Sequence, residues 1–339
     1  MYEKNNAEKR CHKILEDNGG FIADKTRTIL LEDPVLSDLR PPLEFISKNW
    51  RDPLTPALMS LSCEAVGGRS DETYEVALAM SLMNLSFFIW DDILDKVSLK
   101  LFKPTLFGKF GEGTALIVGG LASAKAFSIL NQTKFDHAKQ QIVSSLLWNL
   151  WAKIAKAEIA SLSSRNSENH SSKKKLKIKA ESIDIETCLK IGGIMGNGSE
   201  SEIRHLGKYG QYLGIILELW KDFHVSVNLT LELHEKIRSG ALPYSLLWAR
   251  ERSAKIQKKL GDLSSKNTEE TCIKEIVEDI LEIKTLDNTV KNIRRFAEKG
   301  RAELIELNRN SAARTLQWFI EAQPRLFIKS LSALRADES

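Results

Sequence analysis

The sequence predicts an all-α protein that folds as a single helical bundle. Apolar residues recur at helical spacing through most of the 339 residues, and no segment alternates apolar and polar residues as a half-buried strand does. The stretch from Val76 to Trp90 contains no proline, glycine or charged residue, which suits a buried helix of about four turns. Three aspartates, Asp91, Asp92 and Asp95, follow it immediately. We therefore expect the bundle to be organised around this helix and its charged end.

The composition indicates a globular chain with a substantial core. Hydrophobic residues make up 42% of it, and the net charge of +4 gives no reason to expect a nucleic-acid partner. Four cysteines without close spacing exclude a Cys-x-x-Cys metal site and a disulfide framework. The polar segment Met1–Asn18 does not resemble a signal peptide, and no uninterrupted apolar run reaches about 18 residues. We therefore expect no membrane span and a cytoplasmic location.

The three aspartates have the spacing of a metal site. Asp91 and Asp95 are four residues apart and Asp92 and Asp95 are three apart, so a helix can point all three toward one side. Like charges at that spacing repel, and a divalent cation such as Mg²⁺ offsets the repulsion. The alternative is a solvated helix end. However, the helix dipole disfavours anions there, and the four residues before Asp91 are bulky and apolar.

The run Asp91-Asp92-Ile93-Leu94-Asp95 behind a long apolar helix resembles the first aspartate-rich motif of the polyprenyl synthetase family. That family belongs to the all-α isoprenoid synthases. The resemblance implies a helical bundle around a deep central apolar cavity, a prenyl diphosphate substrate, three Mg²⁺ ions when diphosphate is bound, and a homodimer. We expect a single domain over 1–339, with the motif-bearing core at about 40–250 and C-terminal helices at 251–339.

The family binds a second diphosphate with side chains that this chain keeps only in part. Lys48 and Arg51 fit the family's basic GKRxRP-like segment, although two ordinary surface cations would explain them equally well. Asn84 stands where the family has a histidine, seven residues before the first aspartate. The run Lys100-Leu101-Phe102-Lys103-Pro104-Thr105 keeps the family's Lys-Pro-Thr but lacks its arginine pair.

The second aspartate-rich motif of the family is degenerate here. Lys221 stands at its first aspartate, Glu218 stands at a preceding glutamine, and only Asp222 keeps a carboxylate. The resemblance implies that Glu218 and Asp222 hold metal from the opposite helix. It also implies that Lys221 contacts the diphosphate or neutralises a carboxylate. The alternative is that this helix is structural and has lost its metal. The following Arg238–Pro243 resembles the family's K-x-T-L-P segment.

A lysine-rich run, Lys173–Lys179, follows a segment rich in serine and asparagine. Most of these lysines have the pattern of a solvated loop. The family places a diphosphate-binding lysine nearby, for which Lys179 is our first candidate and Lys177 our second.

Aromatic side chains near both motifs are candidates to line the cavity, together with Asn84. They are Phe87, Phe88 and Trp220. In the family, bulk four or five residues before the first aspartate limits the product length. Phe87 and Ser86 hold those positions and predict a short or medium chain.

Three functions are compatible with these residues. We favour a class I terpene-synthase-like enzyme, in which Asp91, Asp92, Asp95 and Asp222 are catalytic through the metal that they hold. The reason is that the second diphosphate site has lost most of the family's cations. A head-to-tail prenyltransferase of short or medium chain length is the alternative. A non-catalytic subunit of a heteromeric synthase ranks last, because it would not need a full aspartate triplet.

Overall fold

Helices dominate the computed structural model, which describes residues 4–100, 103–133, 135–164, 182–227, 231–265, 270–282, 285–307 and 310–336. In chain order the elements are α1 (Lys4–Ile29), η1 (Pro34–Leu39), α2 (Arg40–Asn49), α3 (Leu54–Ala65), η2 (Ser70–Thr73), α4 (Tyr74–Leu94), β1 (Leu99–Lys100), β2 (Lys103–Pro104), α5 (Leu106–Gln132), α6 (His137–Ser164), α8 (Ile183–Met195), α9 (Glu200–Val227), α10 (Leu231–Arg238), α11 (Tyr244–Arg250), α12 (Ala254–Ser265), α13 (Glu270–Glu282), α14 (Thr285–Glu303), η3 (Leu304–Glu306) and α15 (Ser311–Ala336). Over these ranges the only sheet is the antiparallel pair β1–β2. The all-α prediction is confirmed.

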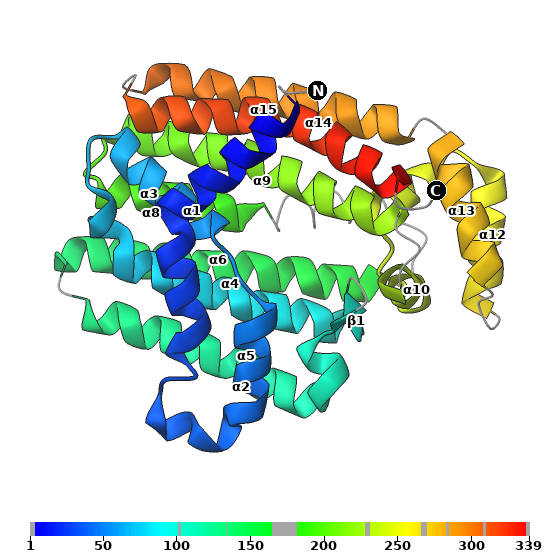
Figure 1. The fold of residues 1–339 in the computed structure, drawn as a ribbon, viewed down its shortest axis with the longest axis horizontal. Coiled ribbons are helices and arrows are strands. Elements are labelled where there is room, and N and C mark those ends of the chain that lie inside the picture. The colour runs from blue at the N-terminus through cyan, green and yellow to red at the C-terminus, as the bar shows by residue number, and fades with distance from the viewer. Residues whose placement is uncertain are drawn as a thin grey trace.

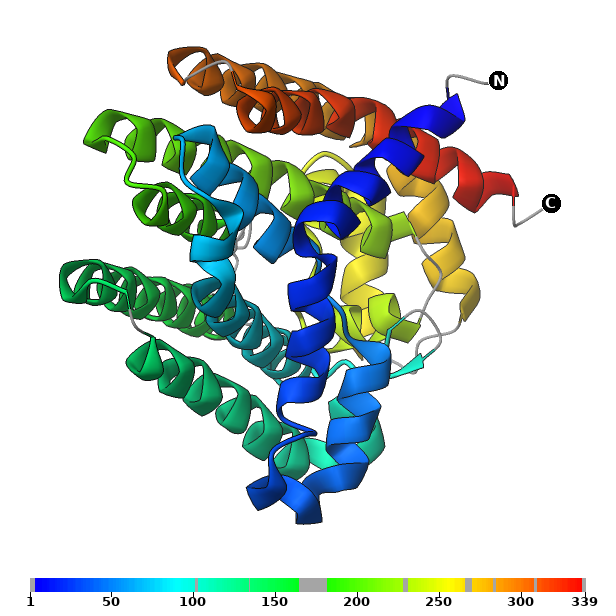
Figure 2. The ribbon, with the colours of Figure 1, turned by 60° about the vertical axis from the view of Figure 1, so that its left-hand side comes forward.

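The long helices follow one another across the molecule in layers (Figure 1). Helices α14 and α15 pack on each other, α14 also packs on α9, and α9 packs on α8. Helix α8 contacts both α3 and α6, while α5 covers α4 on the opposite side of the molecule (Figure 2). Helix α1 runs across α3 and α4. The helix that carries the first aspartate motif is therefore surrounded by other helices.

Helix α4 is buried along most of its length because nearly all of its side chains are apolar. The Ser86 hydroxyl donates to the Gly119 carbonyl of α5 at 2.8 Å and accepts from the Ser123 hydroxyl at 2.9 Å. A Cβ on Gly119 would lie 2.5 Å from Nε1 of Trp90, so the glycine lets that indole lie against α5. The same indole packs on Trp151 of α6, with ring centroids 4.9 Å apart. These contacts fix the position of the motif helix.

A close helix–helix approach also fixes α8 against α3. A Cβ on Gly192 would lie 1.9 Å from Oγ of Ser62 and 2.3 Å from the Met59 carbonyl oxygen, so no larger residue fits without a shift of the backbone. The glycine therefore allows α8 and α3 to pack closely within the main core.

The C-terminal helices are divided between two hydrophobic cores. Helices α14 and α15 belong to the main core, whereas α10, α11, α12 and α13 share a smaller one. The buried members of the smaller core are Leu233, Ile237, Leu246, Ala249, Ile256, Leu260, Ile276, Val277 and Ile280. Val227, at the end of α9, packs against both cores. The helices beyond residue 250 are therefore not one group, and the single-domain assignment stays a prediction.

Two helical segments are long and apolar enough to cross a membrane by length and composition, namely Ser70–Leu94 and Leu106–Gln132. The expectation that no segment qualifies was too strict, because it counted only uninterrupted apolar runs. In the first segment 72% of the apolar window is buried inside the protein, as in the core helix of a soluble protein, and in the second 39% is buried. Two such helices are weak grounds for a membrane assignment.

Candidate active site

The first aspartate motif lies at the C-terminal end of α4, where the helix ends at Leu94 and Asp95 is the C-cap. Asp92 and Asp95 are buried, with 1% and 3% of their surface exposed, and Asp91 is half-buried. The backbone amide of Asp95 donates to the Asp91 carbonyl at 2.9 Å, which closes the last helical turn. The end of the helix therefore carries three carboxylates, two of them buried.

Lys100, on the short strand β1, neutralises two of these carboxylates. Its ammonium forms an ion pair with Oδ1 of Asp92 and lies 4.0 Å from Oδ2 of Asp91. It also lies 4.6 Å from the ring centroid of Phe88, on the face where a cation is attracted. Burial raises the pKa of Asp92 to about 6, although the Lys100 ammonium opposes that rise.

Lys236, on α10, neutralises the third carboxylate. Its Nζ lies 2.5 Å from Oδ2 of Asp95, and both side chains are shielded from solvent. Burial works to lower the pKa of Lys236, but the carboxylates of Asp95 and Asp91 outweigh it, and the pKa is raised. The lysine is therefore positively charged at neutral pH. The sequence singled out neither this residue nor the charge role of Lys100.

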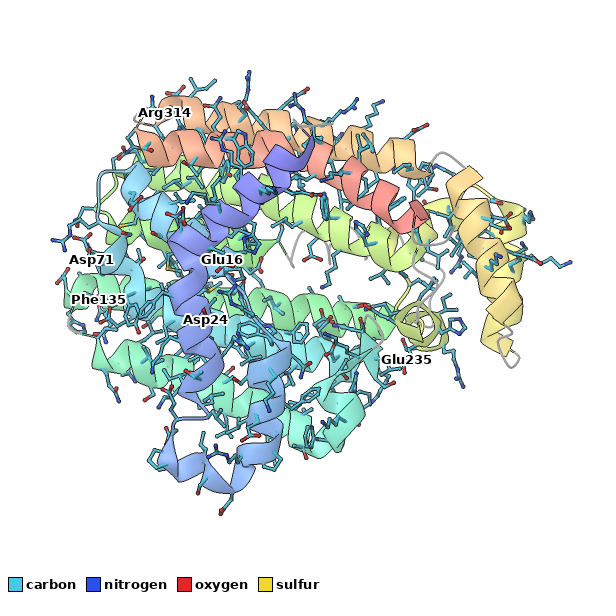
Figure 3. All side chains as sticks on the ribbon, in the orientation of Figure 1. Glu16, Asp24, Asp71, Phe135, Glu235 and Arg314 are labelled. Carbon is cyan, nitrogen blue, oxygen red and sulfur yellow. The ribbon has the colours of Figure 1, made fainter. Side chains whose placement is uncertain are left out.

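The neighbouring residue of α10 anchors the same helix to the motif. The Glu235 carboxylate accepts from the Ser98 amide at 2.7 Å and from the Ser98 hydroxyl. Figure 3 shows Glu235 between α10 and the β1 segment. Two neighbouring residues of α10, Glu235 and Lys236, thus hold this helix against the end of α4.

The donor chemistry of the first motif suits a divalent cation. Carboxylate oxygens are the ligands that Mg²⁺ prefers, and two ammonium groups already lie against them as cations. Oδ1 of Asp92 is buried, and the group that lies against it is the Lys100 ammonium, so this oxygen already faces a cation. Across the described ranges, no three acidic, histidine or cysteine side chains converge as they would around a metal. A divalent ion would therefore have to displace an ammonium group.

The second motif does not offer the same chemistry. Both carboxylate oxygens of Asp222 cap α11, accepting from the Tyr244 amide at 2.6 Å and from the Ser245 amide at 2.9 Å. The Glu218 carboxylate lies 3.9 Å from the Lys221 ammonium on the same helix. Asp222 has a structural role in this arrangement, because its two oxygens accept from the first amides of α11. Metal binding by Glu218 and Asp222 stays a prediction.

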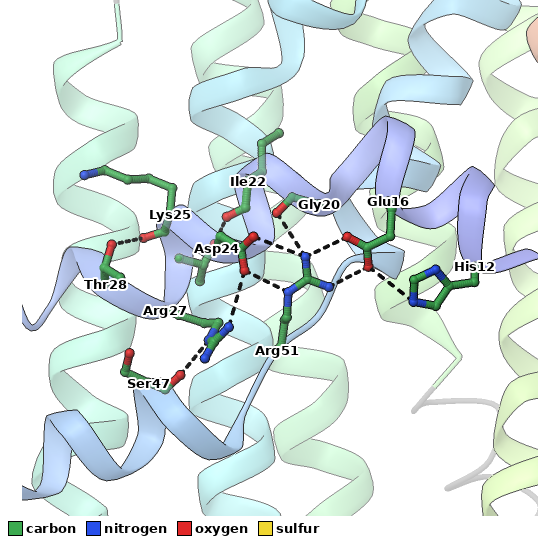
Figure 4. A network of polar contacts seen from close by, with 11 residues as sticks. His12, Glu16, Gly20, Ile22, Asp24, Lys25, Arg27, Thr28, Ser47 and Arg51 are labelled. Atoms are coloured by element: carbon green, nitrogen blue, oxygen red, sulfur yellow. Dashed lines mark hydrogen bonds and ion pairs between the residues drawn. The ribbon is translucent and has the colours of Figure 1, made fainter.

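The two cations predicted to bind a second diphosphate both have carboxylate partners in this structure. The Arg51 guanidinium donates to both oxygens of Glu16, at 2.6 and 2.8 Å, and to Oδ1 of Asp24 at 2.8 Å (Figure 4). The pKa values of both carboxyl groups are held below their usual range by that guanidinium. Lys48 is largely exposed, and its Nζ lies 3.9 Å from a carboxylate oxygen of Glu44. Arg51 is therefore neutralised by helix α1.

Asn84 belongs to a small polar cluster that contains an acid. Its amide nitrogen lies 2.8 Å from Oγ1 of Thr55 and 3.5 Å from Oδ2 of Asp52, both at the start of α3. Oδ1 of Asn84 is buried and without a hydrogen-bond partner. These three residues carry one negative charge and no positive charge. They lie beside α4 about two turns before the aspartates.

The aromatic candidates fall into two groups. Phe87 packs edge-on against Trp151 of α6, with ring centroids 4.7 Å apart, and Phe88 carries the Lys100 ammonium on its face. Trp220 instead contacts the Phe327 ring of α15 at 5.6 Å. The structure therefore does not bring Trp220 against the α4 aromatics, and the deep central cavity stays a prediction. Lys177 and Lys179 lie outside the described residues.

A family model described as polyprenyl synthetase matches residues 47–281. The chain belongs to the polyprenyl synthetase family. Among its relatives, a geranylgeranyl diphosphate synthase of Methanosarcina mazei is 25% identical over 191 residues, which cover 56% of this chain and 59% of the relative. Geranylgeranyl pyrophosphate synthase 11, chloroplastic, of Arabidopsis thaliana is 27% identical over 220 residues, covering 60% and 62%. The chain thus matches about three-fifths of the length of these polyprenyl synthetase relatives.

Solved structures of similar proteins show the same fold. A polyprenyl synthase from Caulobacter crescentus, complexed with calcium and isoprenyl diphosphate, has a TM-score of 0.82 at 18% identity, over 94% of this chain and 97% of that one. A geranylgeranyl pyrophosphate synthetase from Pyrococcus horikoshii has a TM-score of 0.78 at 19% identity, over 94% and 98%. The predicted polyprenyl synthetase architecture is confirmed.

Proposed function

We propose that this chain ionises an allylic prenyl diphosphate and converts it, without isopentenyl diphosphate, into a hydrocarbon or alcohol. The carbon–oxygen bond to the diphosphate breaks, and the electron pair leaves with the diphosphate oxygen. The allylic cation then either loses a proton to give a hydrocarbon or takes up water and loses a proton to give an alcohol. Both outcomes need one diphosphate site.

Divalent ions, for which we propose Mg²⁺, would be held by Asp91, Asp92 and Asp95. When bound, they neutralise the charge that develops on the leaving diphosphate. Lys100 lies beside the same carboxylates and supplies a further positive charge for the diphosphate oxygens. The apolar surface of α4 excludes water, which would otherwise quench the cation too early. The face of Phe88, which already attracts an ammonium, is suited to an allylic cation.

The observation that carries the proposal is the charge of the region where a second diphosphate would bind. Asp52, Thr55 and Asn84 form a cluster with a negative charge, and Arg51 is neutralised by Glu16 and Asp24. A second diphosphate needs several converging cations because no metal is expected at that site. Of the two cations that the resemblance assigns to that site, Arg51 is paired with carboxylates of α1 and Lys48 is largely exposed, so a single exposed cation supports the proposal that a second diphosphate is not held.

A head-to-tail prenyltransferase is the second candidate. It is favoured by the relatives, which are named as geranylgeranyl and short-chain isoprenyl diphosphate synthases. Lys103-Pro104-Thr105 also keeps part of the family's loop, and Lys103 is exposed on β2. The third candidate is a non-catalytic subunit of a heteromeric synthase, and one relative is named as the large subunit of a heterodimeric synthase. The aspartate triplet with its lysine partners argues against that role.

The two enzyme candidates are separated by a product assay. A labelled allylic diphosphate is incubated with the protein and Mg²⁺, with and without isopentenyl diphosphate, and the products are analysed by chromatography. We expect the same hydrocarbon or alcohol in both reactions. A longer prenyl diphosphate, formed only with isopentenyl diphosphate, would establish the prenyltransferase, and no turnover in either reaction would favour the subunit.

We also propose that the chain forms a homodimer through α5 and α6. Both helices expose large apolar side chains, namely Leu116, Ile117, Phe127, Ile142, Trp148, Ile159 and Leu162. Trp148→Lys should convert the dimer into a monomer, as measured by analytical ultracentrifugation, because a charge would be buried at the interface. A wild-type monomer would contradict this assembly. The cytoplasmic location stays a prediction, since some relatives are named as chloroplastic.

A further inference from the structure

We propose that the ammonium group of Lys236 takes the place of one divalent cation at the first aspartate motif. The site would then hold one fewer divalent ion than the same aspartates would hold without this lysine. The inference rests on the proposed function, since it assumes that Asp91, Asp92 and Asp95 hold the remaining ions.

The position of Lys236 is that of a cation shared by the motif. Its Nζ lies 2.5 Å from Oδ2 of Asp95, and Asp91 also acts on it electrostatically. Only 11% of the Lys236 side chain and 4% of the Asp95 side chain are exposed. A buried ammonium is costly unless carboxylates compensate it, so this lysine and the motif depend on each other.

The second motif explains why such a replacement is needed. In the arrangement that the resemblance implies, Glu218 and Asp222 would contribute a metal from α9. Asp222 instead uses both oxygens to cap α11, and a lysine, Lys221, stands between them in the sequence. Lys221 is near enough to oppose the charge of Lys236. A positive charge on this side of the motif is therefore supplied by side chains rather than by a metal bound to α9.

The anchoring of α10 keeps that charge in place without the help of Asp95. Glu235 holds the helix to the amide and hydroxyl of Ser98, so the backbone that carries Lys236 is anchored beside the motif independently of the Lys236–Asp95 ion pair. A freely moving surface lysine would withdraw when a divalent ion arrives. Lys236 is buried and held, so it competes with the ion instead.

The test is a titration of the full-length protein with Mn²⁺, followed by electron paramagnetic resonance and without any prenyl diphosphate. Lys236→Gln removes the charge but can still donate a hydrogen bond to Asp95. We expect this variant to bind Mn²⁺ at least about tenfold more tightly than the wild type and to take up one more ion at saturation, because a competing charge within ion-pair distance is gone.

Two control variants separate the charge at this position from charge in general. Lys236→Arg keeps the charge and should bind Mn²⁺ like the wild type. Lys96→Gln removes the same charge next to the motif, where the exposed Lys96 ammonium pairs with Glu112 at 3.0 Å, and should also behave like the wild type. Wild-type affinity and stoichiometry in Lys236→Gln, or an equal change in Lys96→Gln, would overturn the proposal.

The proposal can also be tested if Lys236→Gln has a folding defect. In that case its thermal unfolding is measured with and without Mn²⁺. Stabilisation by the ion beyond that of the wild type supports the proposal, and its absence overturns it. Because no substrate is present, the result is independent of the product assay. A wild type that forms no product would overturn the proposed function alone.

Discussion

Asp92→Asn should lower turnover of an allylic diphosphate by at least about a hundredfold and leave the protein folded. Asp92 is buried at the end of α4 and, in the proposed mechanism, holds the divalent ion beside the leaving diphosphate. Asparagine keeps the size of the side chain and removes its charge. Turnover is measured by product release in Mg²⁺, and folding by thermal unfolding in chelator.

The difference in stability between Asp92→Asn and the wild type should depend on pH. Burial raises the pKa of Asp92 from 3.8 to about 6, so the folded protein disfavours the charged carboxylate. The contribution of this group to the free energy of unfolding therefore falls by roughly 3 kcal/mol in total as the pH rises from well below 4 to well above 6. Without metal, Asp92→Asn should be as stable as the wild type near pH 4 and more stable near pH 7.

Asp279 offers a matched control outside the site. It is a buried aspartate that pairs with Lys255 at 2.5 Å and Lys259 at 2.9 Å beside the smaller core, and its pKa is lowered, with the two lysines outweighing the effect of burial. Asp279→Asn should destabilise the protein and leave turnover per folded molecule unchanged. If instead Asp92→Asn unfolds early, and the wild type works in chelator, the aspartate triplet is structural.

Isopentenyl diphosphate should bind more weakly than about 1 mM in a calorimetric titration. The ligand carries several negative charges, and holding them takes several side-chain cations where no metal is expected. Arg51 is neutralised by Glu16 and Asp24, and the Asn84 cluster brings in the Asp52 carboxylate. We expect a large loss of affinity because the Asp52 carboxylate beside Asn84 would repel a diphosphate.

The motif helix could be predicted from the sequence because its signal is local. The unbroken apolar run from Val76 to Trp90 is long enough for a helix, and a helix that is apolar all round has to be buried by other elements. The three aspartates follow within one helical turn and a half, so their position together at the end of the helix follows from the helix period. The structure has α4 running through Leu94, with Asp95 as its cap.

The partners of the charged residues could not be predicted because they come from distant parts of the chain. Arg51 meets Glu16 across 35 residues, and Lys236 meets Asp95 across 141 residues. Nothing in the short charged helix around Lys236 distinguishes it from a solvated surface helix. The capping role of Asp222 could not be predicted for a related reason. The N-cap residue of α11 is Pro243, whose side chain has no hydrogen-bonding group, and the Asp222 carboxylate accepts from the Tyr244 amide instead.

The titration of isopentenyl diphosphate into the wild-type protein tests the central claim most directly, namely that this chain lacks a second diphosphate site. It is carried out in Mg²⁺, with an allylic diphosphate titrated under the same conditions to show that the first site is intact. The account predicts binding of the allylic diphosphate and no measurable heat from isopentenyl diphosphate up to about 1 mM. Micromolar binding of isopentenyl diphosphate would contradict the account and identify the protein as a prenyltransferase.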